Sequence, residues 1–293
     1  MGSSGGSGED LCVHLGDYVL RFEDEPEYEE VYRERALTEL RETPELRQQS
    51  LQELKQLMQT EPDLYVPLDD ESLQLAFLRS CKFYPQNAFE RMKQLYRLKT
   101  KHPKYFSNLV PSENKNVFSN NLLTVYPNRD QHGRRILLSC RRCDVFDADR
   151  TVFEAIILTH AAILEPRTQI SGASLMVDVE GLTLQHIWQF TPGFAKMALD
   201  WVQDCLPARI KAIHIVNQPY IFNMVSKKRT GISSIHFHGS DRSSILSHVD
   251  AKCLPVQYGG LCDIDLDKGL ELWALLSKYE WLYQRELIKS YFT

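Results

Sequence analysis

Apolar residues recur through the first third of the chain at the three- and four-residue steps of amphipathic helices. The longest such segment lies between Pro85 and Pro103, and it predicts a helix that one proline starts and another ends. Thr43-Pro44 and Asp69-Asp70 supply N-cap residues for two further helices. The pattern predicts a helical subdomain over residues 28–106. Four basic residues are expected on its solvated face: Arg79, Lys82, Arg91 and Lys93.

The remainder, residues 107–293, alternates short apolar runs with helical patterns. The runs are rich in β-branched residues and predict strands at 122–126, 135–140, 173–179, 210–216 and 235–237. Helical patterns lie at 152–164, after the cap pair Thr191-Pro192, and at 266–291. Leu270, Trp273, Leu276 and Tyr279 recur at spacing three in the last helix. Strands that alternate with helices need crossover connections, so we expect an α/β fold with a mostly parallel sheet flanked by helices.

Bulk composition excludes several classes of protein. The net charge of -5 argues against a dedicated nucleic-acid binder, and no apolar run approaches the roughly 20 residues that cross a bilayer. Seven scattered cysteines favour a reduced, cytosolic compartment. Residues 1–27 begin Gly/Ser-rich and continue acidic, without the apolar segment of a secretory signal. We expect this tail to be disordered or to lie as an arm over the fold.

No residue set has the spacing of a metal site. Cys140 and Cys143 have the gap of half a zinc site, but no second Cys/His pair follows at metal spacing. His236 and His238 flank Phe237 in a strand pattern and would share one face. Further ligands cannot be placed, so structural histidines and no bound metal are expected. The histidines considered are His160, His186, His214, His236 and His238.

Catalytic patterns are equally weak. The chain has no Gly-x-Ser-x-Gly elbow and no glycine-rich phosphate loop. Asp178 and Glu180 precede Gly181 and are expected to bond turn amides rather than act as bases. We therefore predict no enzyme and no catalytic residue. The default pocket of such a domain is an apolar cavity with a few polar groups. Thr159 either faces a ligand there or bonds the preceding helical turn.

A chain of motifs then resembles one family. The segments that carry the resemblance are Asp69-Asp70 with Ala76-Phe77-Leu78-Arg79 and Lys82-Phe83, Asp178-Val-Glu-Gly-Leu182, Thr191-Pro192, Gln203-Asp204 with Pro207, Ile213-His214 with Asn217 and Pro219, Ile235-His-Phe-His-Gly239 and Leu254-Pro255 with Tyr258-Gly-Gly260. In order and spacing they resemble the CRAL-TRIO lipid-binding family over about residues 28–262. Within it, the branch of tocopherol and retinaldehyde carriers and clavesins is the most similar.

The resemblance implies a cytosolic carrier without cofactor, a monomer that holds one hydrophobic molecule such as a tocopherol, retinoid, carotenoid or other lipid. It would release this ligand at phosphoinositide-containing membranes, peripherally on endosomes or elsewhere. An alternative is a phosphoinositide-binding trafficking adaptor with a vestigial or open pocket. The matching positions imply ligand-binding walls at Thr159, Ala173, Leu175, Val177, Ile187, Phe190, Val202 and Ile213. Plain core packing is the competing interpretation of these positions.

Two features concern membranes and the lid that covers the pocket in the family. Residues 225–234 are several residues short of the family's lid segment and lack its Lys-Pro-Phe-Leu. This short segment would leave the pocket more open or weaken the retention of the ligand. Basic residues near this segment attract anionic membranes at about 1 kcal/mol per charge. The predicted phosphoinositide contacts are Arg209, Lys211, Lys227, Lys228 and Arg229.

Overall fold

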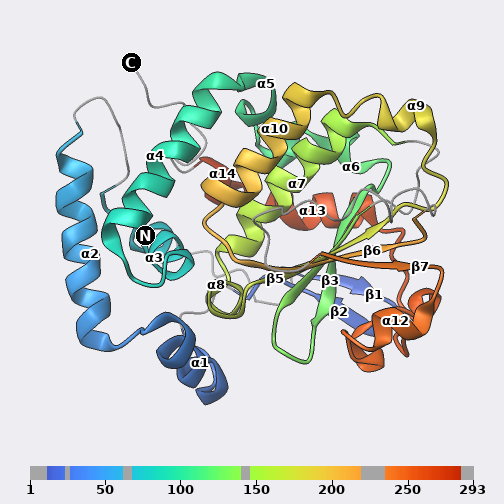
Figure 1. Cartoon of the computed structure of the whole chain (residues 1–293), viewed down its shortest axis with the longest axis horizontal. Helices are drawn as coiled ribbons and strands as arrows, with labels where there is room; N and C mark the ends of the chain where they lie inside the picture. The colour runs from blue at the N-terminus through green and yellow to red at the C-terminus, as the bar shows by residue number, and fades with distance from the viewer. Residues whose placement is uncertain (1–11, 24–26, 62–67, 140–145, 219–234, 285–293) are drawn as a thin grey trace, which may run out of the picture.

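The computed structural model describes residues 12–23, 27–61, 68–139, 146–218 and 235–284. Four helices gather at one end of the molecule (Figure 1): α1 (Glu30–Leu40), α2 (Pro44–Gln59), α3 (Glu71–Ser80) and α4 (Pro85–Lys101). The Thr43 hydroxyl accepts a hydrogen bond from Leu46 N at 3.1 Å, and Asp70 Oδ1 accepts one from Leu73 N at 3.0 Å. These N-caps confirm the predicted helix starts.

The stripe on α4 is buried as its spacing predicts. It packs against α2, α3 and a π-helical turn, η4 (Trp201–Cys205), so it connects the helical layer to the sheet domain. The expectation that the basic residues here are all solvated is wrong for Arg79, which is 2% exposed and paired with Glu42. Arg91 is half-buried, and its Nη1 donates to Leu206 O at 2.8 Å. Distant partners withdraw these two charges from water.

Five strands form one sheet in the order β3-β4-β5-β6-β7. They are β3 (Leu123–Arg129), β4 (Arg135–Ser139), β5 (Ala173–Asp178), β6 (Ile210–Val216) and β7 (Ile235–Gly239). β3 and β4 pair antiparallel, whereas each later neighbour pairs in parallel. The mostly parallel α/β sheet is therefore confirmed. Helix α7 (Ala148–Ile163), with α8 (Pro166–Ser171), connects β4 to β5, and α9 (Leu184–Ile187) and α10 (Pro192–Asp200) connect β5 to β6.

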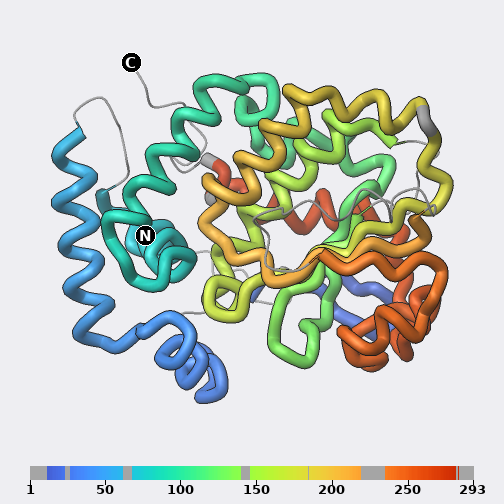
Figure 2. Tube along the Cα trace, in the orientation of Figure 1, coloured from blue at the N-terminus to red at the C-terminus, as the bar shows by residue number. Residues whose placement is uncertain are grey.

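Helices cover the sheet unequally. In Figure 1, α7 and α10 lie above β5–β7, whereas α12 (Arg242–Leu246) lies below them. Figure 2 follows the same crossovers along the Cα trace. The short helices α5 (Pro103–Phe106) and α6 (Lys115–Phe118) pack against α7. Three single turns, η2 (Pro111–Glu113), η5 (Ala251–Cys253) and η6 (Val256–Tyr258), complete this domain.

The two ends of the chain differ in detail from the expectations. Part of the predicted tail is an arm over the fold, a hairpin of β1 (Val13–Leu15) and β2 (Tyr18–Leu20) that packs on β3 and α13. The predicted last helix divides into α13 (Gly269–Lys278) and α14 (Glu280–Gln284). Leu276 and Tyr279 of the predicted stripe are buried, and Trp273 is half-buried against the core. Leu270 is instead 45% exposed, and Leu272 and Leu275 are buried in addition.

Candidate apolar ligand site

Two rows of apolar side chains cross the parallel strands on one face of the sheet. The residues of each row are paired in register across β5, β6 and β7: Leu175, Ile213 and Ile235 in one row, and Val177, Ile215 and Phe237 in the other. Period-2 alternation places all six on the same face. Each is only half-buried, although the alternating residues on the other face, such as Met176 and Val216, are buried. The sheet therefore presents an incompletely covered apolar surface.

This surface is separate from the protein's ordinary core. Leu175 packs against the main apolar cluster, but among the described residues the other five side chains belong to neither cluster. The opposite face turns toward α12, because the rings of His214 and His236 both contact the ring of His248, which follows that helix. The apolar rows consequently face the side of α7 and α10 (Figure 1). We call the six residues the apolar floor.

The predicted wall residues occupy different environments around this floor. Leu175, Val177 and Ile213 lie within it, and Ala173 lies buried at the start of β5. Val202 is half-buried on η4 and packs against the core. Thr159 is buried on α7, and its hydroxyl donates to Ala155 O at 2.6 Å. Of the two alternatives for this hydroxyl, the bond to the preceding turn is therefore the one observed.

Ile187 ends α9, and Phe190 belongs to an aromatic cluster close to this helix. Phe190 stacks on Phe146 with ring centroids 5.7 Å apart and meets the edge of Phe194 at 5.6 Å. Ile187 and Phe190 nevertheless remain 37% and 45% exposed, and Trp188 between them is 82% exposed. Three large apolar side chains are thus exposed within a run of four residues. Soluble proteins rarely expose apolar patches on their surface unless these patches bind another molecule or a membrane.

The predicted phosphoinositide contacts divide into two groups. Arg209 and Lys211 both pair with Glu39 of α1, at 3.1 and 2.9 Å, and the Arg209 side chain is 12% exposed. Burial lowers the pKa of both cations, and Glu39 opposes that effect. These two residues connect the helical layer to the sheet. The triplet Lys227, Lys228 and Arg229 and the short segment 225–234 lie outside the described residues.

The polar residues at the carboxyl end of β5 are engaged in structure. Asp178 Oδ1 accepts hydrogen bonds from Glu180 N at 3.0 Å and from the Asn217 side chain at 2.8 Å. Its other oxygen accepts one from the Tyr258 hydroxyl at 2.8 Å. Asp178 thus fastens three segments and bonds a turn amide, as predicted. Within the described ranges, His, Cys, Asp and Glu side chains form no group of three arranged to hold a metal ion.

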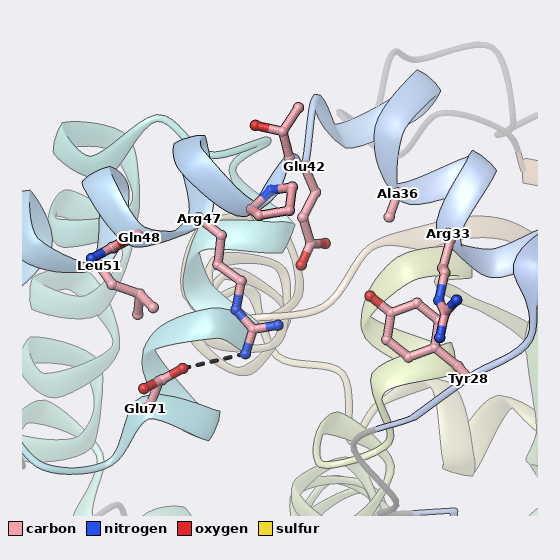
Figure 3. A pocket seen from close by; sticks show the side chains of 10 residues that line it. Tyr28, Arg33, Ala36, Glu42, Arg47, Gln48, Leu51 and Glu71 are labelled. Carbon is pink, nitrogen blue, oxygen red and sulfur yellow. Dashed lines mark hydrogen bonds and ion pairs between the residues drawn. The ribbon is translucent and has the colours of Figure 1, made fainter.

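A separate groove of about 590 Å³ lies in the helical layer (Figure 3). Side chains of α1, α2 and α3 line it, and an ion pair between Arg47 and Glu71 spans 3.2 Å across it. Arg33 and Glu42 also line this groove, so both charge signs are present. Its mixed charge does not match a hydrophobic molecule, and it lies at the opposite end from the sheet (Figure 1).

Sequence patterns missed part of the floor and, in the exposed patch, Trp188. Ile215, Ile235 and Phe237 were identifiable from the alternation within β6 and β7, since they share the period of Ile213. Trp188 had no such signal, because exposure depends on what the rest of the fold leaves uncovered. No helix in the described part of the chain is both long and apolar enough to cross a membrane.

Comparison with known proteins agrees with the motif order. Residues 119–260 match the CRAL/TRIO domain. The alpha-tocopherol transfer protein-like protein of Homo sapiens is 33% identical over 238 residues, which cover 77% of this chain and 69% of that protein. Clavesin-1 of Mus musculus is 29% identical over 241 residues, which cover 78% and 67%.

Among solved structures, Sfh5 superposes with a TM-score of 0.47 and 12% identity, over 81% of this chain and 98% of that one. A likeness this weak supports no argument about ligand or site. The identity to the two curated relatives over most of the chain does decide the family. This chain belongs to the CRAL-TRIO family.

Proposed function

We propose that the chain binds one hydrophobic small molecule on the apolar floor and transfers it at membrane surfaces. The observation that supports this function most strongly is the register of the floor. Leu175, Ile213 and Ile235 form one continuous row, and an identical arrangement of apolar residues lies one pleat along the strands. Such a surface gains free energy from a nonpolar ligand, at about 25 cal/mol per Å² covered. A few hundred Å² would contribute several kcal/mol by that coefficient.

The ligand class follows from the chemistry of the floor and from the relatives. The six floor residues carry no polar side-chain atom, so the bulk of the ligand is hydrocarbon. A tocopherol, a retinoid, a carotenoid or another lipid satisfies this condition, and one relative carries tocopherol transfer in its name. The function requires capture and release without a chemical step.

The exposed patch of Ile187, Trp188 and Phe190 supports release at a membrane. Tryptophan and phenylalanine favour the bilayer interface, where an apolar ring is partly dehydrated. The patch lies on the face of the sheet that also carries the floor. A bilayer that contacts the patch would therefore lie close to the place where the ligand leaves the floor. Phosphoinositide headgroups would add electrostatic attraction if they contact the triplet Lys227 to Arg229.

Native mass spectrometry of the full chain, followed by lipid extraction, tests ligand binding. A stoichiometric hydrophobic molecule is expected on the wild-type protein. Ile213→Trp places a larger side chain on the floor and should lower the fraction of protein that carries the ligand. Leu199→Trp changes a 42% exposed position on α10 and should leave this fraction unchanged. An empty wild-type protein, or equal occupancy in the two variants, would contradict the proposal.

Vesicle partitioning tests membrane release. Trp188→Ala should weaken binding to phosphatidylcholine vesicles that contain phosphatidylinositol bisphosphate by about tenfold, which corresponds to about 1.4 kcal/mol. Trp281→Ala changes another exposed tryptophan, on α14, and should have little effect. Strong headgroup-dependent binding by a protein that holds no ligand would instead support the adaptor function. Equal partitioning of the two variants would exclude the patch as the membrane contact.

A further inference from the structure

Four histidine rings gather on the face of the sheet opposite the apolar floor. His214 comes from β6, His236 and His238 come from β7, and His248 follows α12. The ring of His214 stacks on those of His236 and His238, with centroids 5.2 and 5.3 Å apart. The rings of His236 and His248 are 4.1 Å apart. We call this group the histidine cluster.

The hydrogen bond within the cluster requires that His214 and His238 are not both protonated. His214 Nδ1 lies 3.0 Å from His238 Nε2, and His238 Nδ1 lies 2.8 Å from Ser244 Oγ. In either tautomer, a single proton occupies the contact between the two histidines. If both rings became imidazolium, two N–H groups would point at each other. One added proton can be accommodated by a change of tautomer, but the second cannot.

Neighbouring elements do little to neutralise added charge. Arg134, from the β3–β4 connection, disfavours protonation of His214, and Asp241 at the N-cap of α12 favours that of His238. Met176 is the register partner of His214 on β5 and carries no charge. Asp130 lies 3.9 Å from Arg134, which it partly neutralises. The net surroundings therefore oppose a second positive charge.

Burial adds to this effect. Burial and, to a smaller extent, the neighbouring histidines together lower the pKa of His214 to about 3 and that of His238 to about 4. The pKa of His236 is also lowered, first by burial and then by His248. His214 and His238 are 4% and 5% exposed, whereas His248 is exposed to solvent. Protons thus have a route into the cluster at its His248 side.

The cluster is mechanically connected to the floor through β6 and β7. His214 pairs in register with His236, and this pair lies between the floor pairs Ile213–Ile235 and Ile215–Phe237. β7 is the last strand in the sheet order, so it can move away without separating any other described strand pair. A movement of β7 driven from the histidine face therefore removes Ile235 and Phe237 from the floor.

We propose that the histidine cluster is an acid-sensitive latch, which releases β7 from β6 and opens the apolar floor as pH falls from 7 toward 5. The opening itself is independent of the proposed function; only its consequence, faster ligand loss in acidic surroundings, rests on that function. Within the described residues no metal-binding group exists here, and proton uptake is the chemistry that four adjacent imidazoles provide.

The direction of the pH dependence follows from proton linkage. In the closed state the lowered pKa values keep His214, His236 and His238 neutral, whereas detachment of β7 returns these three rings to an ordinary pKa of about 6.5. The open state then binds more protons at pH 5 to 6, so acid favours opening. Each histidine that recovers its ordinary pKa should raise the ratio of open to closed protein by about 20-fold between pH 7 and pH 5.

Hydrogen–deuterium exchange of the full chain tests the latch. Amides of β7 and β6 should exchange faster at pH 5 than at pH 7, after correction for intrinsic rates, while amides of β3 and β4 should not. The double variant H236Q/H248Q keeps the His214–His238 contact but removes His236, one of the three rings with a lowered pKa, together with its neighbour His248, and it should shift opening to lower pH. H14Q, which changes an exposed histidine on β1, should behave as the wild type.

The proposal is overturned if exchange in β7 does not rise on acidification, or if H236Q/H248Q and H14Q respond alike. Should the double variant not fold, the single variant H236Q, at a half-buried position on β7, provides the same comparison. Release of a fluorescent tocopherol analogue at pH 5 and pH 7 measures the consequence separately. Acid opening without binding of this analogue at either pH would support the latch and count against the tocopherol-carrier function.

Discussion

Arg79 donates two hydrogen bonds to the carboxylate of Glu42, from Nε to Oε2 at 2.9 Å and from Nη2 to Oε1 at 2.7 Å. Both side chains are almost fully buried, at 3% and 6% exposure. Arg79 Nη1 also donates to Gln169 Oε1 on α8 at 2.6 Å. The pair therefore joins three segments that are distant in sequence, and it connects the helical layer to the domain that carries the floor.

Removal of Arg79 should be costly, because Glu42 would remain buried as an unpaired charge. Arg79→Ala is expected to lower the free energy of unfolding by about 3–5 kcal/mol. Urea denaturation followed by circular dichroism measures this loss. Arg33→Ala, which breaks an exposed pair with Glu30, should cost less than about 1 kcal/mol. Similar losses in the two variants would show that the buried pair is not what joins the layers.

The two groups of predicted membrane cations should respond differently to mutation. Replacement of Lys227, Lys228 and Arg229 by alanine should weaken binding to anionic vesicles at low salt, by about 1 kcal/mol for each charge that contacts the surface. Lys211→Ala instead removes a partner of Glu39, so it should lower thermal stability with little change in vesicle binding. Unchanged sedimentation of the triple variant with the vesicles would refute the triplet as a membrane contact.

Lys99 is a buried cation with no ion partner among the residues that the structure describes. Its side chain is 3% exposed, no hydrogen bond from these residues reaches Nζ, and the ring of Tyr96 lies 5.5 Å from Nζ. Burial lowers the pKa of Lys99 to about 7. Between this pKa and the ordinary value of about 10.4, the unfolded chain binds the proton more tightly than the folded one.

The destabilisation that the buried ammonium group of Lys99 causes should therefore diminish as pH rises from 7 to 10. Lys99→Met is expected to raise the free energy of unfolding by roughly 2–4 kcal/mol at pH 7 and by progressively less toward pH 10. Thermal unfolding at several pH values measures the difference. Lys101→Met, on the exposed side of the same helix, is the matched control. A difference that stays constant with pH would show that Lys99 is already paired or hydrated.

Two glycines contrast a closely packed position with an open one. A Cβ on Gly260 would lie 1.9 Å from Leu254 O and 2.3 Å from Leu254 C, so the backbone would have to move. Gly260→Ala should destabilise the protein by several kcal/mol, in line with the larger effects of strain on point mutants. Gly193 has no neighbour within 4 Å of its hypothetical Cβ and lies in the first turn of α10.

Gly193→Ala should accordingly be neutral or stabilise by roughly 0.5–1 kcal/mol, because glycine is unfavourable within a helix. Differential scanning calorimetry distinguishes the two outcomes. If Gly260→Ala melted within a degree of the wild type, the close approach to Leu254 would not be rigid, and the turn that follows η6 would have room to relax.

Local patterns predicted the elements because they depend on near neighbours in sequence. Thr43 and Thr191 cap their helices from three residues away, and Ile213 shares a face with Ile215 because strands alternate. The parallel order followed from helices between strands. These relationships need no knowledge of what lies across the molecule, and the family motifs, which are also read along the chain, agreed with them.

Tertiary structure decided which side chains are covered, paired or left open. Glu39 pairs with Arg209, which lies 170 positions away in the sequence, and His248 contacts histidines of two strands. The floor stays half-buried although its residues are as apolar as those of the core. Burial, pKa and exposure are properties of contacts between distant residues, which no local pattern encodes. The sequence by itself determined the strands and their alternation, and only the packed chain determined that one apolar face of the sheet is left half-covered.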